Sequence, residues 1–489
     1  MDGTQDLTGG EQVSICLRHV DEDLNAHEDF IGLYSVESTT GSELARVAKD
    51  VAMRLGIDMK NARAQTYDGA SNMQGKNIGC GSLIKQEYPL VMRFHCRAHA
   101  ANLVIKAACE ASLLVNKALT TLQDLAKFYK KSLNVRREVH ALCKELDYPD
   151  SNLNSIRPLC PTRWLCRLKP VQSTVDNYPL LLQAFSKLAV SVELSAEAKS
   201  KAQRIFKNLA DAETFLGLSL VLKPFALLEQ FSLTLQGEKV DFDSAEEAVQ
   251  KVDELIKKYR DSDFDEHFES AKSLPEKFED IIVKPLREPR QRRIPIRYGG
   301  GSRDASSDLQ QHYRIQYFQF VDKITVEIRE RFSYNSSDSD LSSYRELAQI
   351  FKTGVIPNSV KSYPEIDFVK LSSQVKSFRE HTNADSVHSA KKAYQEMDSL
   401  ERGLFPQVFI LLKILLVCPI SSTSCERSFS TLRRLKTWLR NRMGQKRLNF
   451  NAVCSIHKDL LKQVDIRVIL QDFINKNSNR RNKFGSMKS

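Results

Sequence analysis

The hydrophobic and polar positions at the start of the chain follow the period of strands and then that of a helix. Residues 12–20 place apolar side chains at every second position, and residues 30–36 repeat this after a polar turn, which predicts an antiparallel hairpin. From Ser42 to Leu55 the apolar positions recur at helical spacing, and Gly56 stands where a helix C-terminal cap is expected. This part of the chain therefore predicts a sheet with a helix packed on it.

Two further short strands are predicted at residues 62–67 and 91–94. The first ends at Asp68, which a glycine follows, and a carboxylate before such a turn is commonly held over a sheet edge. The second runs into a helix that carries Cys96 and His99 at its start. The alternative is an ordinary tight turn beside one buried cysteine. The order of strand, strand, helix, strand and helix predicts a mixed α/β sheet with helical cover.

The middle of the chain has the period of helices. Residues 113–146 form either one long amphipathic helix or a helix pair, and residues 171–233 continue the pattern. Residues 284–303 contain seven Lys or Arg against one Glu, with three prolines and three consecutive glycines, and this composition predicts a mobile basic loop. The last packed segment lies at 405–470, and the basic tail is expected to be disordered.

Composition narrows the class of protein. A chain of 489 residues has room for roughly two to four domains. It contains no run of about 18 apolar residues, which predicts no membrane-spanning helix, and its polar, acidic start does not resemble a secretory signal. Ten scattered cysteines without a CxxC pair then indicate reduced thiols in the cytosol or nucleus. The net charge of +11 is compatible with binding to a polyanion.

A second informative stretch lies near the C-terminus, where a predicted helix precedes a basic run. Thr423 and Glu426 have the spacing of a capping box, so the structural interpretation of Glu426 is that it caps this helix. Residues 431–447 contain seven Lys or Arg and no acidic residue. This run is either a solvated helix face or, together with Arg292 and Arg293, a surface that follows phosphates.

Four motifs along the chain carry a family resemblance. They are Tyr67-Asp68-Gly69-Ala70-Ser71-Asn72-Met73, His95-Cys96-x-x-His99-x-x-Asn102-Leu103, Thr162-Arg163-Trp164 and Ser424-x-Glu426-Arg427-x-Phe429-Ser430. In this order they resemble the hAT superfamily of DNA transposases, close to the zinc-finger MYM-type protein 1-like domesticated members. The resemblance covers nearly the whole chain, and four motifs in order are far more specific than any one alone.

The resemblance implies an α/β plus α fold, in which a ribonuclease-H-like mixed sheet is split by a long all-helical insertion. It predicts four parts. Residues 1–109 are the N-terminal part of the ribonuclease-H-like domain, with a truncated first strand, and residues 110–404 are the helical insertion with its basic loop at 284–303. Residues 405–475 are the hAT C-terminal dimerisation region that completes the core, and residues 476–489 are a disordered basic tail.

The family's catalysis uses two Asp and one Glu that hold divalent metal. Two cations that bridge the scissile phosphate stabilise both the attacking and the leaving oxygen, and Mg²⁺ prefers hard oxygen ligands. By motif, the second Asp is Asp68 and the Glu is Glu426, while Asp2 takes the place of the first Asp. The resemblance therefore implies that these three residues are catalytic and metal-binding, with Mg²⁺ or Mn²⁺ as the cofactor only in an active enzyme.

Asp2 departs from the family pattern. The strand expected before it is missing, Gly3 replaces the expected Glu, and the N-terminal zinc-finger domain of many relatives is absent. A ligand one residue from a free amino terminus lacks rigid support, and a site about 1 Å too loose loses much of its rate. We therefore expect a truncated or decayed copy whose catalytic site is silent.

The remaining motif residues are expected near bound DNA. Cys96 and His99 have CxxH spacing without a second such pair, which argues against a structural zinc site. The resemblance implies that they lie beside the catalytic centre as DNA-proximal residues, and it implies the same for Arg163 and Trp164. Trp164 is equally well interpreted as a core aromatic, although bases do stack on such side chains.

Two hypotheses remain open. The first is a domesticated or decayed hAT transposase-like protein in the nucleus, catalytically silent, which forms a homodimer or higher oligomer through its C-terminal region, binds nucleic acid and contacts no membrane. Apolar residues at Val408–Val417 and Phe429–Leu439, in excess of one helix's needs, support the dimer. The second is an active metal-dependent DNA transposase or nuclease with an Asp-Asp-Glu triad. The missing support for Asp2 favours the first.

Overall fold

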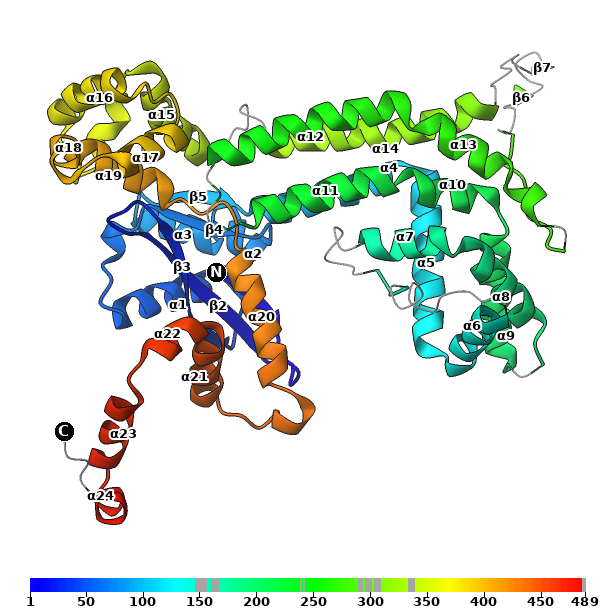
Figure 1. Cartoon of the computed structure of the whole chain (residues 1–489), viewed down its shortest axis with the longest axis horizontal. Helices are drawn as coiled ribbons and strands as arrows, with labels where there is room; N and C mark the ends of the chain where they lie inside the picture. Colours follow the sequence, from blue (N-terminus) through cyan, green and yellow to red (C-terminus); the bar gives the residue numbers. More distant parts are fainter. Residues whose placement is uncertain are drawn as a thin grey trace. The chain divides into compact units, whose positions relative to one another are not determined.

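The computed structural model divides the chain into two compact units (Figure 1). Residues Met1–Arg93 and Ser422–Ser489 form one unit, here called the sheet unit, and Phe94–Ser421 form the other, the helical unit. The structure describes residues 1–145, 156–159, 167–192, 194–237, 240, 242–278, 280–288, 293–294, 301–302, 309–332 and 339–485.

The sheet unit begins with three antiparallel strands in the order β1-β2-β3. They are β1 (Asp2–Gln5), β2 (Glu11–Val20) and β3 (Ala26–Val36). The predicted hairpin is confirmed as β2 and β3, whose pairing has one irregularity after Ile15. The hydrophobic pattern does not predict β1, because its four residues, Asp-Gly-Thr-Gln, have no apolar alternation. Pairing with β2 makes it a strand, with Asp2 opposite Ser14.

The chain continues through a helix and a second small sheet. Its elements are α1 (Gly41–Arg54), η1 (Met59–Asn61), β4 (Ala64–Tyr67), α2 (Ser71–Gln74), α3 (Cys80–Glu87) and β5 (Met92–His95). Helix α1 ends as predicted before Gly56, whose φ of 69° is a left-handed conformation that glycine adopts without strain. Strands β4 and β5 pair with each other, so the two short strands expected from the sequence are confirmed.

Both faces of the β1-β2-β3 sheet carry apolar side chains that are covered. One cluster joins the sheet to α1, β4 and α3 through Val13, Ile15, Val36, Leu44, Val47, Val51, Tyr67 and Ile84. A second joins β3 to α20 (Thr423–Leu435) and α21 (Gln445–Ile456) through Phe30, Leu33, Phe429, Leu432, Leu448 and Ala452 (Figure 1). The C-terminal segment therefore completes a core that the N-terminal segment begins.

The helical unit is built almost entirely from helices. They are α4 (Arg97–Ala111), α5 (Leu113–Lys131), α6 (Leu133–Glu145), α7 (Leu168–Asp176), α8 (Tyr178–Val190), α9 (Ala196–Leu209), α10 (Ala212–Leu220), α11 (Leu222–Leu235), α12 (Phe242–Ser262), α13 (Phe264–Lys272), α14 (Leu309–Phe332), α15 (Ser339–Thr353), α16 (Phe368–Thr382), α17 (Val387–Glu396), α18 (Ser399–Leu404) and α19 (Pro406–Leu416), with the short strands β6 (Arg293–Ile294) and β7 (Gly301–Ser302). Residues 113–146 contain a helix pair, because Ser132 ends α5 and its hydroxyl accepts a hydrogen bond from the Val135 N–H at 3.4 Å.

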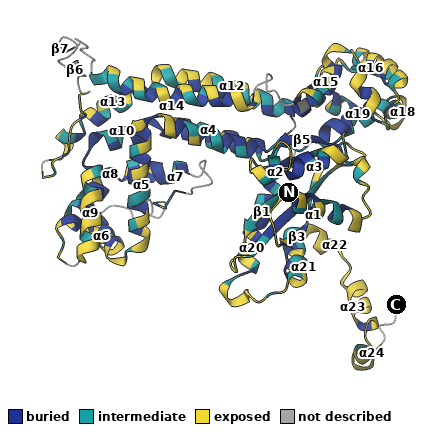
Figure 2. Cartoon of the chain, turned by 180° about the vertical axis from the view of Figure 1, so that it is seen from behind, coloured by how far each residue is buried: buried dark blue, intermediate teal, exposed yellow. Residues whose placement is uncertain are grey.

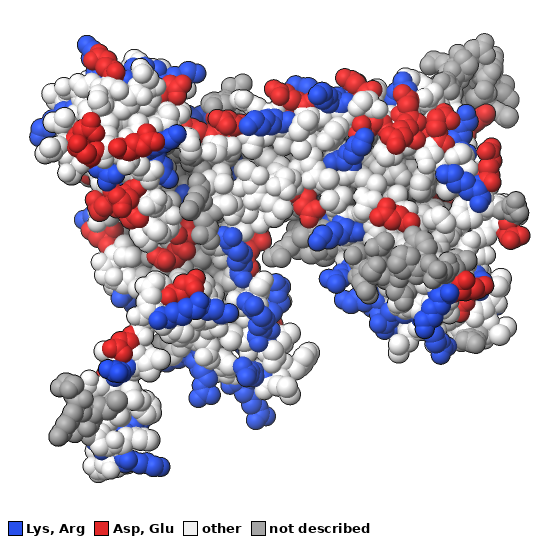
Figure 3. All heavy atoms as spheres, in the orientation of Figure 1, with Lys and Arg blue, Asp and Glu red and all other residues white. Residues whose placement is uncertain are grey.

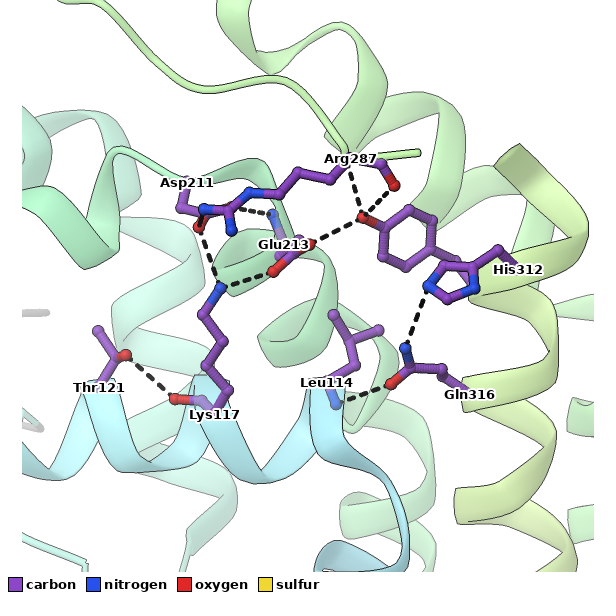
Figure 4. Close-up of polar contacts among 9 residues, drawn as sticks. Leu114, Lys117, Thr121, Asp211, Glu213, Arg287, His312 and Gln316 are labelled. Carbon is purple, nitrogen blue, oxygen red and sulfur yellow. Dashed lines mark hydrogen bonds and ion pairs between the residues drawn. The ribbon is translucent and has the colours of Figure 1, made fainter. Parts of the chain in front are cut away.

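A polar network joins α5, α10, α14 and residues 284–288 (Figure 4). Asp211 is 3% exposed and caps α10 by accepting from the Glu213 N–H at 3.2 Å. The Lys117 ammonium lies 3.0 Å from Asp211 and 2.6 Å from Glu213, and Arg287 lies 2.9 Å from Asp211. Tyr313 donates to Glu213 at 3.0 Å. Arg287 belongs to the predicted basic loop, so this network fixes the start of that loop, most of which lies outside the described residues.

The helical unit has wider bounds than the predicted insertion at 110–404, and the four-part division of the chain stays a prediction. It begins at Phe94 instead of residue 110, because α4 packs against α11 and α14. It ends at Ser421 instead of residue 404, because α19 packs against α15, α16 and α17. The apolar run Val408–Val417 is therefore mostly buried within this unit, and its excess of apolar residues is explained without a partner.

The C-terminal segment extends beyond the core as three short helices. They are α22 (Lys458–Gln463), α23 (Ile466–Asn475) and α24 (Ser478–Phe484). The tail that we expected to be disordered thus contains α24, which begins where the Asn477 side chain accepts a hydrogen bond from the Asn479 N–H at 2.9 Å.

Among the described residues of the helical unit, one stretch is apolar enough to cross a membrane by length and composition. It is Ala212–Leu235, which comprises α10 and α11, and 61% of its most apolar window is buried inside the unit. Helices α4 and α5 pass the same test only as a pair that is bent by 107°. Buried core helices have the same composition, so the expectation that no helix crosses a membrane stays a prediction.

Candidate functional site

The three carboxylates implied by the resemblance all lie in the sheet unit, on three different elements. Asp2 opens β1, and its Oδ1 accepts a hydrogen bond from the Gly3 N–H at 2.8 Å. Asp68 directly follows β4, as predicted, and its Oδ1 accepts from the Ala70 N–H at 3.2 Å. Glu426 lies in the first turn of α20. All three side chains are partly buried.

These carboxylates lie close enough to interact electrostatically. Burial raises the pKa of Asp2, the negative charges of Asp68 and Glu426 act in the same direction, and the net pKa is about 7. A carboxyl group in this environment still holds its proton in a large fraction of molecules at neutral pH. The structure thus brings together the three residues that the sequence could connect only by family resemblance.

Proximity does not give these carboxylates the geometry of a metal site. Carboxylate oxygens are the correct ligand type for Mg²⁺ or Mn²⁺. Among the residues that the structure describes, however, no three His, Cys, Asp or Glu side chains are placed to share one ion. The donor chemistry fits the implied metal, but the arrangement does not.

The capping interpretation of Glu426 is wrong. Helix α20 begins at Thr423 with Ser422 as its N-cap, and no side chain there makes a capping hydrogen bond. Glu426 is therefore the fourth residue of the helix and is too far along it to close a capping box. Its position in the first turn still suits a negative charge, because the N-terminal end of a helix dipole is positive.

The surroundings of Glu426 contain buried polar groups that the sequence did not reveal. Arg18 and Glu28 face each other across β2 and β3 as an ion pair of 2.8 Å, with side chains 8% and 11% exposed. The Ser424 hydroxyl donates to the second oxygen of Glu28. Because Arg18 and Glu28 occupy opposing positions of a predicted hairpin, their pairing was within reach of sequence analysis, whereas the contact with Ser424 was not.

Two further contacts fasten α20 to the sheet. The Ser428 hydroxyl donates to Ser14 at 2.8 Å, and both residues are buried. One turn earlier, the thiol of Cys425 hydrogen-bonds with that of Cys16 on β2. This contact and, after it, burial raise the pKa of Cys16, so its thiol stays protonated. The helix that carries Glu426 is therefore held to β2 by polar as well as apolar contacts.

Two of the predicted DNA-proximal residues, Cys96 and His99, belong to the helical unit. Cys96 is the N-cap of α4, and its sulfur accepts from the His99 N–H at 3.5 Å, which gives the CxxH spacing a structural explanation. The His99 ring lies 5.8 Å from that of His95. Their predicted proximity to DNA stays a prediction. Arg163 and Trp164 lie outside the described residues.

The basic run at 431–447 is not one continuous cationic face. Lys436 turns inward and forms a buried ion pair with Asp6 of the β1–β2 turn. Burial alone would raise the pKa of Asp6, but the hydrogen bonds from Lys436 and Thr8 hold it well below its usual range. The other six cationic side chains are exposed, as Figure 3 shows for the end of α20 and the loop after it. They are Arg433, Arg434, Arg440, Arg442, Lys446 and Arg447.

Comparisons with known proteins agree with this picture at both ends of the chain. Residues 1–79 match the family model described as the ZMYM1/FAM200 RNase-like domain, and residues 395–460 match the hAT family C-terminal dimerisation region. Curated relatives include the mouse and human proteins named 52 kDa repressor of the inhibitor of the protein kinase. The chain is 20% identical to the mouse protein over 487 residues and 20% identical to the human protein over 490 residues.

Each of these two alignments covers 96% of this chain but only 62% of the relative. The chain therefore spans less than two thirds of the length of the curated proteins it matches. The matched regions include all three implied carboxylates, Asp2 and Asp68 in the first region and Glu426 in the second. Together the matches confirm the predicted resemblance: the start of the chain is similar to an RNase-like domain, and residues 395–460 are similar to the hAT C-terminal dimerisation region.

Proposed function

We propose that this chain is a domesticated or decayed hAT transposase-like protein that forms a homodimer through its C-terminal region, binds nucleic acid in the nucleus and does not cut DNA. Its sheet unit is then a ribonuclease-H-like domain that the helical unit interrupts. The assembly of the sheet unit from two separate chain segments supports this. Nuclear residence fits the basic segments, which have the composition of import signals.

The observation that carries the dimer is an uncovered apolar face on α23. Ile466, Ile469, Leu470 and Phe473 recur at helical spacing and are 42–76% exposed. Figure 2 shows α23 mostly in the colour of exposed residues. Contiguous apolar faces of this kind mark interaction surfaces. A second copy of the chain is the partner that we propose, because α23 directly follows the matched dimerisation region.

Light scattering after size exclusion at micromolar concentration tests the dimer. We expect the parent chain to be a dimer and the double variant Ile466→Glu/Ile469→Glu to be a monomer, because two charges on the interface would be desolvated. Val369→Glu is the matched control, since Val369 is an equally exposed apolar residue of α16. A monomeric parent chain would overturn the dimer.

The state of Asp2 supports catalytic silence. With its pKa raised to about 7, Asp2 would have to release its proton when a divalent cation binds, which weakens such binding near and below neutral pH. The neighbouring Asp68 and Glu426 add negative charge near Asp2. Among the described residues, however, the three carboxylates are not arranged around a common position for a metal ion. A ligand set that is not preformed holds two cations in register less well, and this supports a silent site.

The second candidate function is an active metal-dependent DNA transposase or nuclease. It is favoured by one observation, the electrostatic contact among carboxylates from three separate elements in motif order. Calorimetric titration of Mn²⁺ into the parent chain, Asp68→Ala and Glu426→Ala distinguishes the two functions. If the site is catalytically silent, we expect no Mn²⁺ binding that depends on Asp68 or Glu426. If it is active, we expect the parent chain to bind Mn²⁺ and both variants to lose that binding.

Nucleic-acid binding is supported by charge. The six exposed cationic side chains between residues 433 and 447 have no acidic residue among them. Neutralising phosphates with Lys and Arg releases counterions, so such a surface binds polyanions in a salt-dependent way. Filter binding at 50 and 200 mM salt tests this, and salt-independent or absent binding would contradict it.

A further inference from the structure

The loop between α20 and α21, residues 436–445, is fastened to the sheet at both ends. At its start, Lys436 is 8% exposed and pairs with Asp6, and its ammonium also donates to Thr8 at 3.3 Å. At its end, Gln445 exchanges side-chain amide hydrogen bonds of 3.0 and 3.1 Å with Gln12 and donates to the Leu33 carbonyl at 2.8 Å. The sheet unit therefore holds this loop in place instead of leaving it to fold back on the core.

The middle of this loop presents an aromatic side chain to solvent. Residues Trp438–Arg440 form a single 3₁₀ turn, closed by a hydrogen bond of 2.9 Å from the Arg440 N–H to the Thr437 carbonyl. Trp438 is 78% exposed and Leu439 is 97% exposed. Tryptophan is rarely so exposed in a position fixed from both sides, because burial of its ring is strongly favourable. The arrangement keeps the indole available for a ligand.

Cationic side chains flank Trp438 on both sides. Arg433 and Arg434 precede it on α20, and the Arg434 guanidinium is steadied by a hydrogen bond of 3.0 Å to Thr431. Arg440 and Arg442 follow it within the loop, and both are exposed. An exposed aromatic between guanidinium groups combines a stacking platform with charges that track a phosphate backbone.

We propose that the 436–445 loop is a site for single-stranded nucleic acid, in which Trp438 stacks on an unpaired base and the flanking arginines contact adjacent phosphates. The proposal rests on the nucleic-acid binding proposed above and names the form of nucleic acid that is bound. An unpaired base offers an open π face, whereas bases inside a duplex are covered by their neighbours. Stacking does not read base identity, so the site tolerates any sequence.

Charge favours nucleic acid over a protein partner at this loop. Tryptophan and arginine are common in protein interfaces as well, so the sign of the charge decides: the run 431–447 has seven Lys or Arg and no acidic residue, and the whole chain carries a net charge of +11, which suits a polyanion better than a second basic copy of the chain. The exposed Leu439 would suit a protein contact. The competing explanation is that this loop contacts a second copy of the chain, and the experiment must distinguish that contact from nucleic-acid binding.

Fluorescence anisotropy of the full chain with a labelled 20-nucleotide single strand, and with the duplex of the same sequence, tests the site. We expect Trp438→Ala to weaken single-strand binding by roughly 5- to 100-fold, the range for losing one stacked base. Trp438→Phe should retain most of the affinity, because it keeps an aromatic face. Duplex binding should be unchanged in both variants. Leu439→Ala is the matched control, since it alters the neighbouring exposed side chain, and it should bind the single strand like the parent.

A second readout uses the fluorescence of Trp438 itself. The chain contains two tryptophans, so Trp164→Phe leaves Trp438 as the sole indole. Saturable quenching of its emission by the single strand is expected from stacking. Salt dependence gives another test. For Arg440→Ala, the slope of the logarithm of the single-strand binding constant against the logarithm of the salt concentration should be smaller in magnitude by about 0.7, because one phosphate contact is lost.

Four outcomes decide between the alternatives. Loss of single-strand affinity in Trp438→Ala, with duplex affinity retained, supports the site. Unchanged affinity in Trp438→Ala, while Arg440→Ala weakens binding, overturns the stacking site but leaves nucleic-acid binding intact. Absence of binding to either nucleic acid by the parent chain overturns both proposals. Normal single-strand binding by a Trp438→Ala variant that has become monomeric identifies Trp438 as a contact between copies and overturns the site.

Discussion

The sheet unit and the helical unit differ in how the chain closes their cores. The helical unit is one continuous segment, and its internal network of Lys117, Asp211, Glu213, Arg287 and Tyr313 joins helices of that segment alone (Figure 4). The sheet unit is made from the two ends of the chain, and its second apolar cluster does not exist until α20 and α21 reach β3. The helical unit should therefore fold on its own, whereas the sheet unit needs both ends.

This difference matters for function because the candidate site lies in the discontinuous unit. Asp2 and Asp68 come from the first segment, and Glu426 comes from the second. The proposed nucleic-acid loop belongs to the second segment and is fastened to the first through Asp6 and Gln12. Both features therefore depend on the same long-range association, and they should be lost together.

The largest expected effect comes from deleting residues 422–489. Without α20 and α21, the β3 residues Phe30 and Leu33, now 4% and 1% exposed, would face water. We expect hydrogen exchange to show loss of protection in β2 and β3 while α4, α11 and α14 stay protected. Deletion of residues 486–489 is the control. Persistent protection of β2 and β3 in the longer deletion would show that the first segment folds alone.

The next largest effect is expected from Lys436→Met. It leaves the buried Asp6 carboxylate, whose side chain is 1% exposed, without its partner, which costs roughly 3–5 kcal/mol. The folded-state pKa of Asp6 is depressed, so the stabilisation is present above the unfolded pKa of about 4 and is lost as pH falls below it. Denaturant unfolding at neutral pH and below pH 4 measures both effects. Arg440→Met, an exposed cation of the same loop, should have little effect, and equal losses in the two variants would contradict the account.

Asp2 should produce the opposite pH dependence. Its pKa is raised to about 7 in the folded state against about 4 when unfolded, so the folded chain binds more protons in that interval. The stability of the sheet unit should therefore fall as pH rises from about 4 to about 7, and Asp2→Asn should flatten this part of the profile. Asp459→Asn, whose carboxylate is 91% exposed, should leave the profile as in the parent. A parent profile that rises over this interval and is unaffected by Asp2→Asn would be inconsistent with a proton-holding Asp2.

The smallest effect is expected from Ser428→Ala. It removes the buried hydrogen bond of 2.8 Å to Ser14, which should lower the free energy of unfolding by about 1 kcal/mol. Ser430→Ala, on the exposed side of the same helix, should change it much less. If both variants unfold like the parent, the polar contacts between α20 and β2 contribute nothing beyond the apolar core.

The sequence predicted those parts of the fold that depend on local pattern. The β2–β3 hairpin, the end of α1 at Gly56 and the place of Asp68 after β4 follow from periodicity and turn chemistry. The sequence did not predict β1, the packing of α19 in the helical unit or the inward turn of Lys436. Each of these depends on a partner far away in the chain: β2 for β1, helices α15 to α17 for α19, and Asp6 for Lys436.

The candidate site shows the same division. Asp2, Asp68 and Glu426 were assigned to one site because of the family motifs, and the hydrophobic periodicity alone would not have connected them. The capping interpretation of Glu426 failed because the helix starts at Thr423, one residue earlier than a capping box with Thr423 as the N-cap requires. Trp438 was passed over because the apolar stretch Phe429–Leu439 was interpreted as part of a dimer contact, whereas α20 ends at Leu435 and both Trp438 and Leu439 are exposed to solvent.

The measurement that tests the account most directly is a paired assay of DNA binding and DNA cutting. Labelled single-stranded and duplex DNA would be incubated with the parent chain and with Asp68→Ala in Mn²⁺, and each sample divided between a binding measurement and a denaturing gel. The account predicts that the parent binds DNA and leaves every strand intact, as does Asp68→Ala. Cut strands that appear with the parent and disappear with Asp68→Ala would contradict catalytic silence and establish the active enzyme.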